Sequence, residues 1–113
     1  MAGEVLVDTN VLVYAYDRAE PAKQRRALDT LRRLVSCGRG RLSAQVLAEF
    51  FRAATSKIRA PLSSADAYGQ VAALIRAWPV LPITSLVVLE AARGVRDHRL
   101  AYWDAQVWAT ARL

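Results

Sequence analysis

The sequence predicts an α/β fold, a three-layer sandwich in which a short parallel sheet is flanked by helices. Residues 4–7, 41–42 and 80–83 are short apolar segments with the composition of strands. The longer segments between them carry apolar residues at helical spacing. Strands that are separated by helices pair in parallel through right-handed crossovers, so the helices cover the faces of the sheet. Ligands of such folds bind at the carboxyl ends of the strands.

The length and composition of the chain fit one packed domain that covers residues 1–113. The 113 residues match the usual size of a domain, and the hydrophobic fraction of 54% excludes a disordered or low-complexity chain. Residues 11–15 form the longest apolar run, far below the roughly 20 residues that span a bilayer. Cys37 is the single cysteine, and no signal-peptide pattern occurs at the N-terminus. We therefore expect a soluble, cytoplasmic protein with no membrane contact.

Three helices are expected in the first half of the chain. Residues 8–10 follow the first strand and suit a strand-to-helix turn with an N-cap, and the short helix that follows extends through Tyr16. Pro21 is well placed in the first turn of a second, amphipathic helix, which ends at the glycine-containing residues 37–40. Ser43 follows the second strand and is placed to cap a third helix, which contains Glu49.

Three further helices are expected in the second half. Ser63 and Asp66 resemble a capping box at the start of a helix that runs to about Ala77. Thr84 or Ser85 follows the third strand and starts the next helix, and residues 101–112 form the last one. The apolar positions expected on the helix after the third strand are Leu86, Leu89 and Ala92.

Three acidic residues, Asp8, Glu49 and Asp104, lie at positions where a buried carboxylate is expected. Asp8 ends an apolar strand, Glu49 borders the apolar face of its helix, and Asp104 has apolar helical neighbours. A desolvated carboxylate is unfavourable unless it is paired or coordinated, and a shared cation is one explanation. Clustered acids without His or Cys favour Mg²⁺ or Mn²⁺ over zinc. The alternatives are that Asp8 is a helix N-cap and that Glu49 and Asp104 pair with nearby arginines.

The charge of the chain points to an acidic partner. Lysine and arginine number 16 against 10 for aspartate and glutamate, which gives a net charge of +6, and only Lys23 and Lys57 are lysines. Arginine binds phosphate groups through two parallel hydrogen bonds, so a nucleic acid or an acidic protein is the expected partner. The alternative is that these side chains form an ordinary solvated surface.

Three segments of the sequence resemble the PIN-domain ribonucleases, and in particular the VapC toxins of VapBC toxin–antitoxin systems. Residues 5–12, VLVDTNVL, are similar to the family's first strand and its Asp-Thr-Asn motif. Residues 42–50, LSAQVLAEF, are similar to the strand and helix that carry the second acid, and residues 102–105, YWDA, to the helix start that carries the third. The order and spacing of these segments carry the resemblance, which covers nearly the whole chain.

The resemblance implies that Asp8, Glu49 and Asp104 are metal-binding catalytic residues of an endoribonuclease that uses Mg²⁺ or Mn²⁺. The residues implied in supporting hydrogen-bonding roles are Asn10, Thr9 and Ser43. The expected partners are the RNA substrate, a cognate antitoxin protein that covers the acidic pocket, and a second copy of the chain in a homodimer or swapped assembly.

Contacts with RNA are expected from basic and aromatic side chains near the acids. The arginines expected beside the RNA backbone are Arg18, Arg52, Arg93, Arg96 and Arg99. The aromatic residues that are candidates for stacking on unpaired bases are Tyr14, Tyr16, Trp103 and Trp108. Aromatic residues inside apolar patterns belong more often to the core, and single arginines more often to a solvated surface.

The chain departs from the family at its C-terminal end. The family continues into another strand, a Thr-x-Asp segment with a fourth acid and a last strand, and no residue here matches that acid. Without these strands, one edge of the first strand is expected to be unpaired, and an exposed edge promotes association. Three interpretations stay open: a fragment of a longer protein, an assembly that covers the edge, or a truncated or degenerate PIN domain that binds RNA or a protein without cleaving.

Two other classes with an aspartate at a strand end fit less well. Phosphatases of the haloacid dehalogenase kind need a second aspartate two residues after the first, and this position is Asn10. A response-regulator receiver domain needs an acidic pair before its phosphoacceptor, whereas only Glu4 precedes Asp8. The sequence thus leaves two main hypotheses, a metal-dependent endoribonuclease and a binding module with the same fold.

Overall fold

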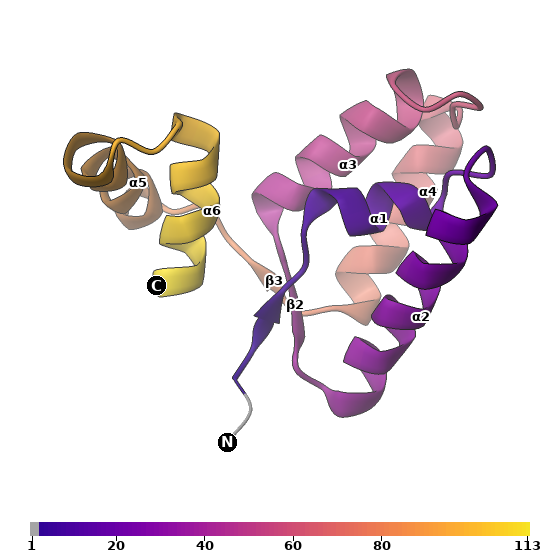
Figure 1. Cartoon of the computed structure of the whole chain (residues 1–113), viewed down its shortest axis with the longest axis horizontal. Coiled ribbons are helices and arrows are strands. Elements are labelled where there is room, and N and C mark those ends of the chain that lie inside the picture. Colours follow the sequence, from indigo (N-terminus) through magenta and orange to yellow (C-terminus); the bar gives the residue numbers. More distant parts are fainter. Residues whose placement is uncertain (1–2) are drawn as a thin grey trace.

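The computed structural model describes residues 3–113 and contains a small parallel sheet between two groups of helices. The elements in chain order are β1 (Val5–Leu6), α1 (Thr9–Ala15), α2 (Pro21–Cys37), β2 (Gly40–Ser43), α3 (Ala44–Ser56), α4 (Ser64–Ala77), β3 (Val80–Leu81), α5 (Ser85–His98) and α6 (Tyr102–Arg112). Helices α1 to α4 lie on one side of the strands, and α5 and α6 lie on the other (Figure 1). The predicted three-layer α/β sandwich is therefore confirmed. Within the described range, no helix has the length and hydropathy needed to cross a membrane.

The sheet brings the carboxyl ends of its strands to one edge. Its strand order is β1-β2-β3, and both strand pairs are parallel. Val5 pairs with Gly40 in the first ladder, and Leu42 pairs with Val80 in the second. Within residues 3–113, β1 is an edge strand with β2 as its one neighbour, so the expected unpaired edge of the first strand is present. The chain segments that follow β1 and β2 therefore start side by side.

The helix starts predicted from capping residues are confirmed. The side chains of Asp8, Ser43, Ser63 and Thr84 each accept a hydrogen bond from a backbone N–H in the first turn of the following helix. A cap of this kind stabilises a helix by about 1 kcal/mol. Pro21 occupies the first turn of α2. Because Asp8 lies two residues after the end of β1 and Ser43 is the last residue of β2, helices α1 and α3 begin at the carboxyl edge of the sheet.

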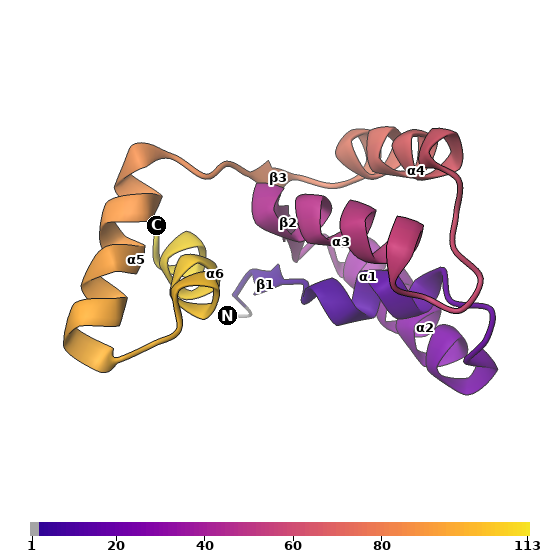
Figure 2. The ribbon, with the colours of Figure 1, turned by 90° about the horizontal axis from the view of Figure 1, so that it is seen from above.

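Two separate apolar clusters hold the elements together. The larger cluster lies among the strands and helices α1 to α4, and Leu12, Leu42 and Phe50 in it are fully buried. The buried members of the smaller cluster, between α5 and α6, are Val87, Ala91, Ala105 and Ala109. Figure 2 shows the α5–α6 pair standing apart from the other helices, at one end of the molecule. The position of α6 relative to α1 and α3 thus depends on contacts outside the two clusters.

The helix after the third strand is confirmed as α5, but its predicted apolar face is wrong. Leu86 and Leu89 are 66% and 68% exposed, and Ala92 is exposed as well. The buried face instead carries small residues such as Ala91 and Gly94. Small side chains let α5 approach α6 closely, so close backbone packing decides which face is buried.

Gly94→Ala should lower the free energy of unfolding by about 1–3 kcal/mol, the usual effect of overpacking. A Cβ at this position would lie 2.8 Å from the ring of Trp108, so α5 and α6 would have to separate. The matched control is Gly69→Ala within α4, where a Cβ meets nothing within 4 Å. The control should gain about 0.5–1 kcal/mol, because alanine is the better helix former. Urea unfolding measures both, and a stabilised Gly94→Ala protein would contradict the close α5–α6 contact.

Candidate functional site

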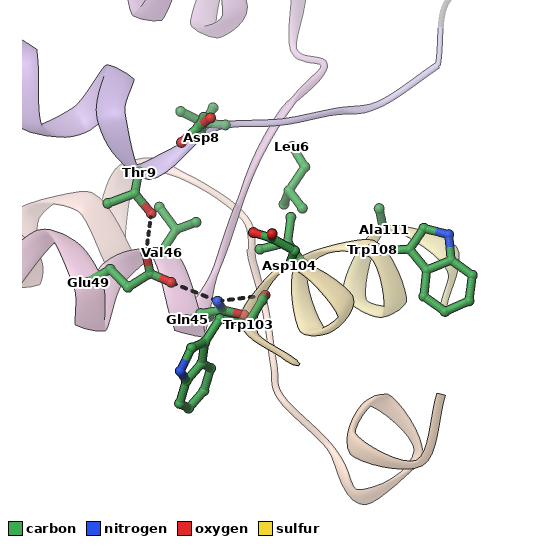
Figure 3. Close-up of a pocket in the computed structure, with 12 residues that line it drawn as sticks. Leu6, Asp8, Thr9, Gln45, Val46, Glu49, Trp103, Asp104, Trp108 and Ala111 are labelled. Atoms are coloured by element: carbon green, nitrogen blue, oxygen red, sulfur yellow. Dashed lines mark hydrogen bonds between the residues drawn. The ribbon is translucent and has the colours of Figure 1, made fainter. Parts of the chain in front are cut away.

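The three predicted acids line one cavity beside the carboxyl edge of the sheet. Asp8 is the N-cap of α1, just after β1, Glu49 lies on α3, and Asp104 lies in the first turn of α6. Together with Thr9 and Gln45 they line a cavity of about 490 Å³, here called the acidic cavity (Figure 3). The fold therefore brings together three carboxylates from three separate elements.

All three carboxylates are exposed, so the expectation of buried, desolvated acids is wrong. The residues next to them are buried as predicted, with Val7 at 3% exposure and Phe50 and Ala105 at 0%. Each acid, however, extends from a buried backbone segment into an open cavity. Because water can solvate these side chains, desolvation of the carboxylates gives no argument for a bound cation. The argument rests instead on the fact that all three line one cavity.

Glu49 is held by hydrogen bonds from two helices. Thr9 Oγ1 donates to Glu49 Oε2 over 3.1 Å, and Gln45 Nε2 donates to Glu49 Oε1 over 2.7 Å. Thr9 is the first residue of α1, and Gln45 lies one turn before Glu49 on α3. The two bonds fix the orientation of the carboxylate, and they place Thr9, an expected supporting residue, in direct contact with this acid.

Two buried glutamines connect α3 to the start of α6. Gln45 and Gln106 are each 4% exposed, and Gln106 Nε2 donates to Gln45 Oε1 over 2.9 Å. Gln45 Nε2 also donates to the backbone carbonyl of Trp103 over 3.2 Å, and the hydroxyl of Tyr102 donates to Gln106 Oε1 over 3.0 Å. We call this glutamine pair and its hydrogen bonds to Glu49, Trp103 and Tyr102 the amide ladder. It fixes the first turn of α6, which carries the third acid.

A second cavity, here called the outer cavity, adjoins the acidic cavity. It has a volume of about 740 Å³ and shares the three acids and Thr9 with its neighbour. Arg52, Lys57 and Arg59 also line it. Arg52 was expected beside RNA, whereas Lys57 and Arg59 follow the third helix in a stretch without a recognisable pattern. The acids thus lie between the acidic cavity, which is lined by many apolar residues, and the outer cavity, which is lined by several basic residues.

The other predicted supporting residues have mainly structural contacts. Ser43 is fully buried, and its hydroxyl accepts a hydrogen bond from the N–H of Val46 at the start of α3. Asn10 donates its backbone N–H to Asp8 Oδ1, and it also lines the outer cavity. Asp17, which no sequence motif singled out, lines that cavity as well and is 8% exposed.

Four of the five arginines expected beside RNA line neither of these cavities. They are Arg18, Arg93, Arg96 and Arg99. Arg93 pairs with Glu90 and Asp97 on its own helix, and Arg96 pairs with Asp97. The hydrogen bond from Arg96 holds the pKa of the Asp97 carboxyl below its usual value. The two α5 arginines therefore already have acidic partners, whereas Arg52 is the one expected arginine beside the acids.

The donor chemistry of the acids fits a hard divalent cation. Carboxylate oxygens are the ligands that Mg²⁺ and Mn²⁺ prefer. Within residues 3–113, no group of three or more His, Cys, Asp or Glu side chains is arranged to hold a metal ion. Both oxygens of Glu49 accept hydrogen bonds, from Thr9 and Gln45. Coordination of one ion by all three acids therefore requires rotations of their side chains within the shared cavity that bring the carboxylate oxygens closer together.

Comparisons with known proteins agree with the arrangement of helices and strands. The family model described as the PIN domain matches residues 5–113. The crystal structure of Mycobacterium tuberculosis VapC20, described as a Sarcin-Ricin loop cleaving toxin, matches with a TM-score of 0.67 and 20% sequence identity. The match covers 95% of this chain and 80% of that chain, and at this identity it shows a common fold. No curated protein matches the sequence.

Gln106→Leu should lower the free energy of unfolding by about 1–3 kcal/mol, because it leaves the buried Oε1 of Gln45 without its donor. The same change in a Gln45→Leu background should cost less, because no buried amide then loses a partner. Urea unfolding of both single variants and the double variant gives the coupling energy, expected at about 0.5–3 kcal/mol. Additive effects of the two substitutions would contradict a direct contact between these amides.

Proposed function

The chain belongs to the PIN-domain family, and we propose that it is a divalent-metal-dependent endoribonuclease. The observation that carries this proposal is the convergence of Asp8, Glu49 and Asp104 on one cavity. The three come from β1–α1, α3 and α6, so no local structural requirement explains their meeting. Among residues 3–113, no cationic side chain forms a hydrogen bond or salt bridge with these three carboxylates. Such a site suits a hard cation and the phosphodiester that it would bind.

The three acids would hold Mg²⁺ or Mn²⁺ by their carboxylate oxygens. A divalent cation in such a site supplies Lewis acidity and offsets the negative charge of the acids and of a phosphodiester. The chain's own contribution is orientation. Thr9 and Gln45 fix the carboxylate of Glu49, and the N–H of Asn10 fixes Asp8 Oδ1 and leaves Oδ2 for a ligand or a water proton.

We assign the binding of the RNA backbone to the basic residues of the outer cavity. The acids alone would repel a polyanion, so positive charge is needed beside them. Arg52, Lys57 and Arg59 supply it, and they share this cavity with all three acids. A strand that crosses the outer cavity would place flanking phosphates on these side chains and one phosphodiester at the carboxylates. The expected roles of Arg18 and of the α5 arginines have no comparable support.

We further propose that the protein is the toxin of a toxin–antitoxin pair and acts in the cytoplasm. The sequence motifs resemble the VapC toxins, and VapC20 has the same fold. A cognate antitoxin that covers the acidic cavity would neutralise such a nuclease. A second copy of the chain would cover the open edge of β1, since an unpaired strand edge promotes association.

A binding module that no longer cleaves RNA is the alternative function. One observation favours it: the three carboxylates are not arranged to share an ion within the described residues. The two functions differ in one measurable property, which is cleavage of RNA by the purified protein.

Asp8→Asn should reduce cleavage of a labelled single-stranded RNA in Mg²⁺ or Mn²⁺ by more than about 100-fold, the upper range for losing a residue that only supports a metal ligand. The fold should be unchanged or more stable, because asparagine caps a helix as well as aspartate and repulsion between carboxylates falls. Gel analysis of the products and thermal unfolding measure the two effects.

The matched control is Asp29→Asn, the same chemical change at an exposed acid of α2. The Asp29→Asn protein should cleave RNA at the parent's rate, and EDTA should stop cleavage by the parent and by this variant. An Asp8→Asn protein that cleaves at the parent's rate would overturn the role of Asp8. A parent protein that binds RNA or metal without any cleavage would favour the binding module.

A further inference from the structure

The three tryptophans of the chain differ in exposure. Trp78 is buried at 8% exposure, and Trp108 lies half-buried against the guanidinium groups of Arg93 and Arg112. Trp103 is 66% exposed. Tryptophan is highly buried on average, so an indole that projects from the residue next to a candidate catalytic acid calls for an explanation.

The exposed indole of Trp103 has a well-anchored backbone. Its carbonyl accepts a hydrogen bond from the buried amide of Gln45, and the ring of Tyr102 packs edge-on against the indole with the centroids 5.2 Å apart. Figure 3 shows that the indole of Trp103 and the carboxylate of Asp104 point to different sides of the start of α6. The fold therefore presents the ring at a defined place beside the acids.

Trp103 lines a third cavity, here called the tryptophan cavity, with Glu49, Arg52, Lys57 and Ile83. Its volume is about 440 Å³, within the roughly 300–1,000 Å³ of ligand pockets. The indole and Ile83 supply apolar surface, and Arg52 and Lys57 supply positive charge. Among the described residues, neither base forms a salt bridge. The cavity thus combines a flat aromatic face with two available cations.

We propose that the tryptophan cavity binds one unpaired base of a single-stranded or looped RNA, which stacks on Trp103 while Arg52 and Lys57 bind the adjoining phosphates. This inference rests on the proposed function. An aromatic platform beside positive charge is the combination that single-stranded nucleic acid requires. Glu49 lines both this cavity and the acidic cavity, so a base held here places a neighbouring phosphodiester beside the acids.

Fluorescence anisotropy tests the stacking site with a labelled, unstructured RNA of about ten nucleotides, within the usual length of such sites. All variants are made in the Asp8→Asn background with Mg²⁺ present, so that the probe stays intact. Trp103→Ala should weaken binding about 5- to 140-fold, which corresponds to about 1–3 kcal/mol for one stacked base. Trp103→Phe should keep part of the affinity. Tyr68→Ala, at a residue of α4 that is 74% exposed, should bind like the background protein.

Two further readouts separate stacking from charge. Trp103→Ala should leave the slope of log affinity against log salt unchanged, whereas Lys57→Ala should reduce its magnitude by about 0.7, the value for one phosphate contact to a single strand. An abasic nucleotide moved along the probe should weaken binding at one position, and Trp103→Ala should cause no further loss with that probe.

The outcomes distinguish this inference from the proposed function. Equal RNA affinity with and without the indole would overturn the stacking site, even if the parent protein cleaves RNA. Binding that depends on Trp103, in a parent protein that cleaves nothing, would support the stacking site and contradict the nuclease. Absence of RNA binding by every variant would overturn the stacking site, and cleavage by the parent protein would still decide the proposed function. Trp103→Ala could instead reduce self-association in sedimentation and leave RNA affinity unchanged. The tryptophan cavity would then contact a second copy of the chain, and the stacking site would be wrong.

Discussion

The hydrogen bond between the buried amides of Gln45 and Gln106 is the contact on which the geometry of the site depends. The apolar cluster of α5 and α6 is separate from the cluster around the sheet, so apolar packing alone leaves the position of α6 weakly determined. A buried amide pair has a strict geometry, because each amide that loses its partner is strongly destabilising. The pair therefore sets where α6, and with it Asp104, lies relative to α3.

The same hydrogen bonds couple the parts of the site to one another. The side chain of Gln45 donates a hydrogen bond to Glu49, one turn later on α3, and another to the backbone carbonyl of Trp103 on α6. Glu49 in turn lines the acidic, outer and tryptophan cavities, which therefore meet at one carboxylate. Binding of an RNA strand across these cavities would require the base site, the phosphate sites and the acids to be held in fixed relative positions. The amide ladder holds Glu49, Trp103 and the start of α6 in such positions.

Much of the fold could be predicted because its signals are local. Strand composition and capping residues such as Asp8 and Ser43 determine where elements begin, and the three acids stand out by their motifs and spacing. The contact of Gln45 with Glu49 could have been predicted, because the two residues lie four positions apart on one helix. The roles of Gln106 and Lys57 could not be predicted, because they depend on how α6 packs against α3. The exposure of the carboxylates could not be predicted either, because it depends on the direction in which each side chain extends from a buried backbone segment.

The most direct test of a single cation site formed by three elements is a titration of the nitrogen-15-labelled protein with Mn²⁺, followed by NMR. Paramagnetic Mn²⁺ broadens the signals of nuclei near it. We expect the signals of the backbone amides of Thr9, Glu49 and Asp104 and of the side-chain amide of Gln45 to broaden together, while signals of α2 and α4 persist. Broadening beside one acid alone, or uniform broadening over the chain, would contradict a shared site.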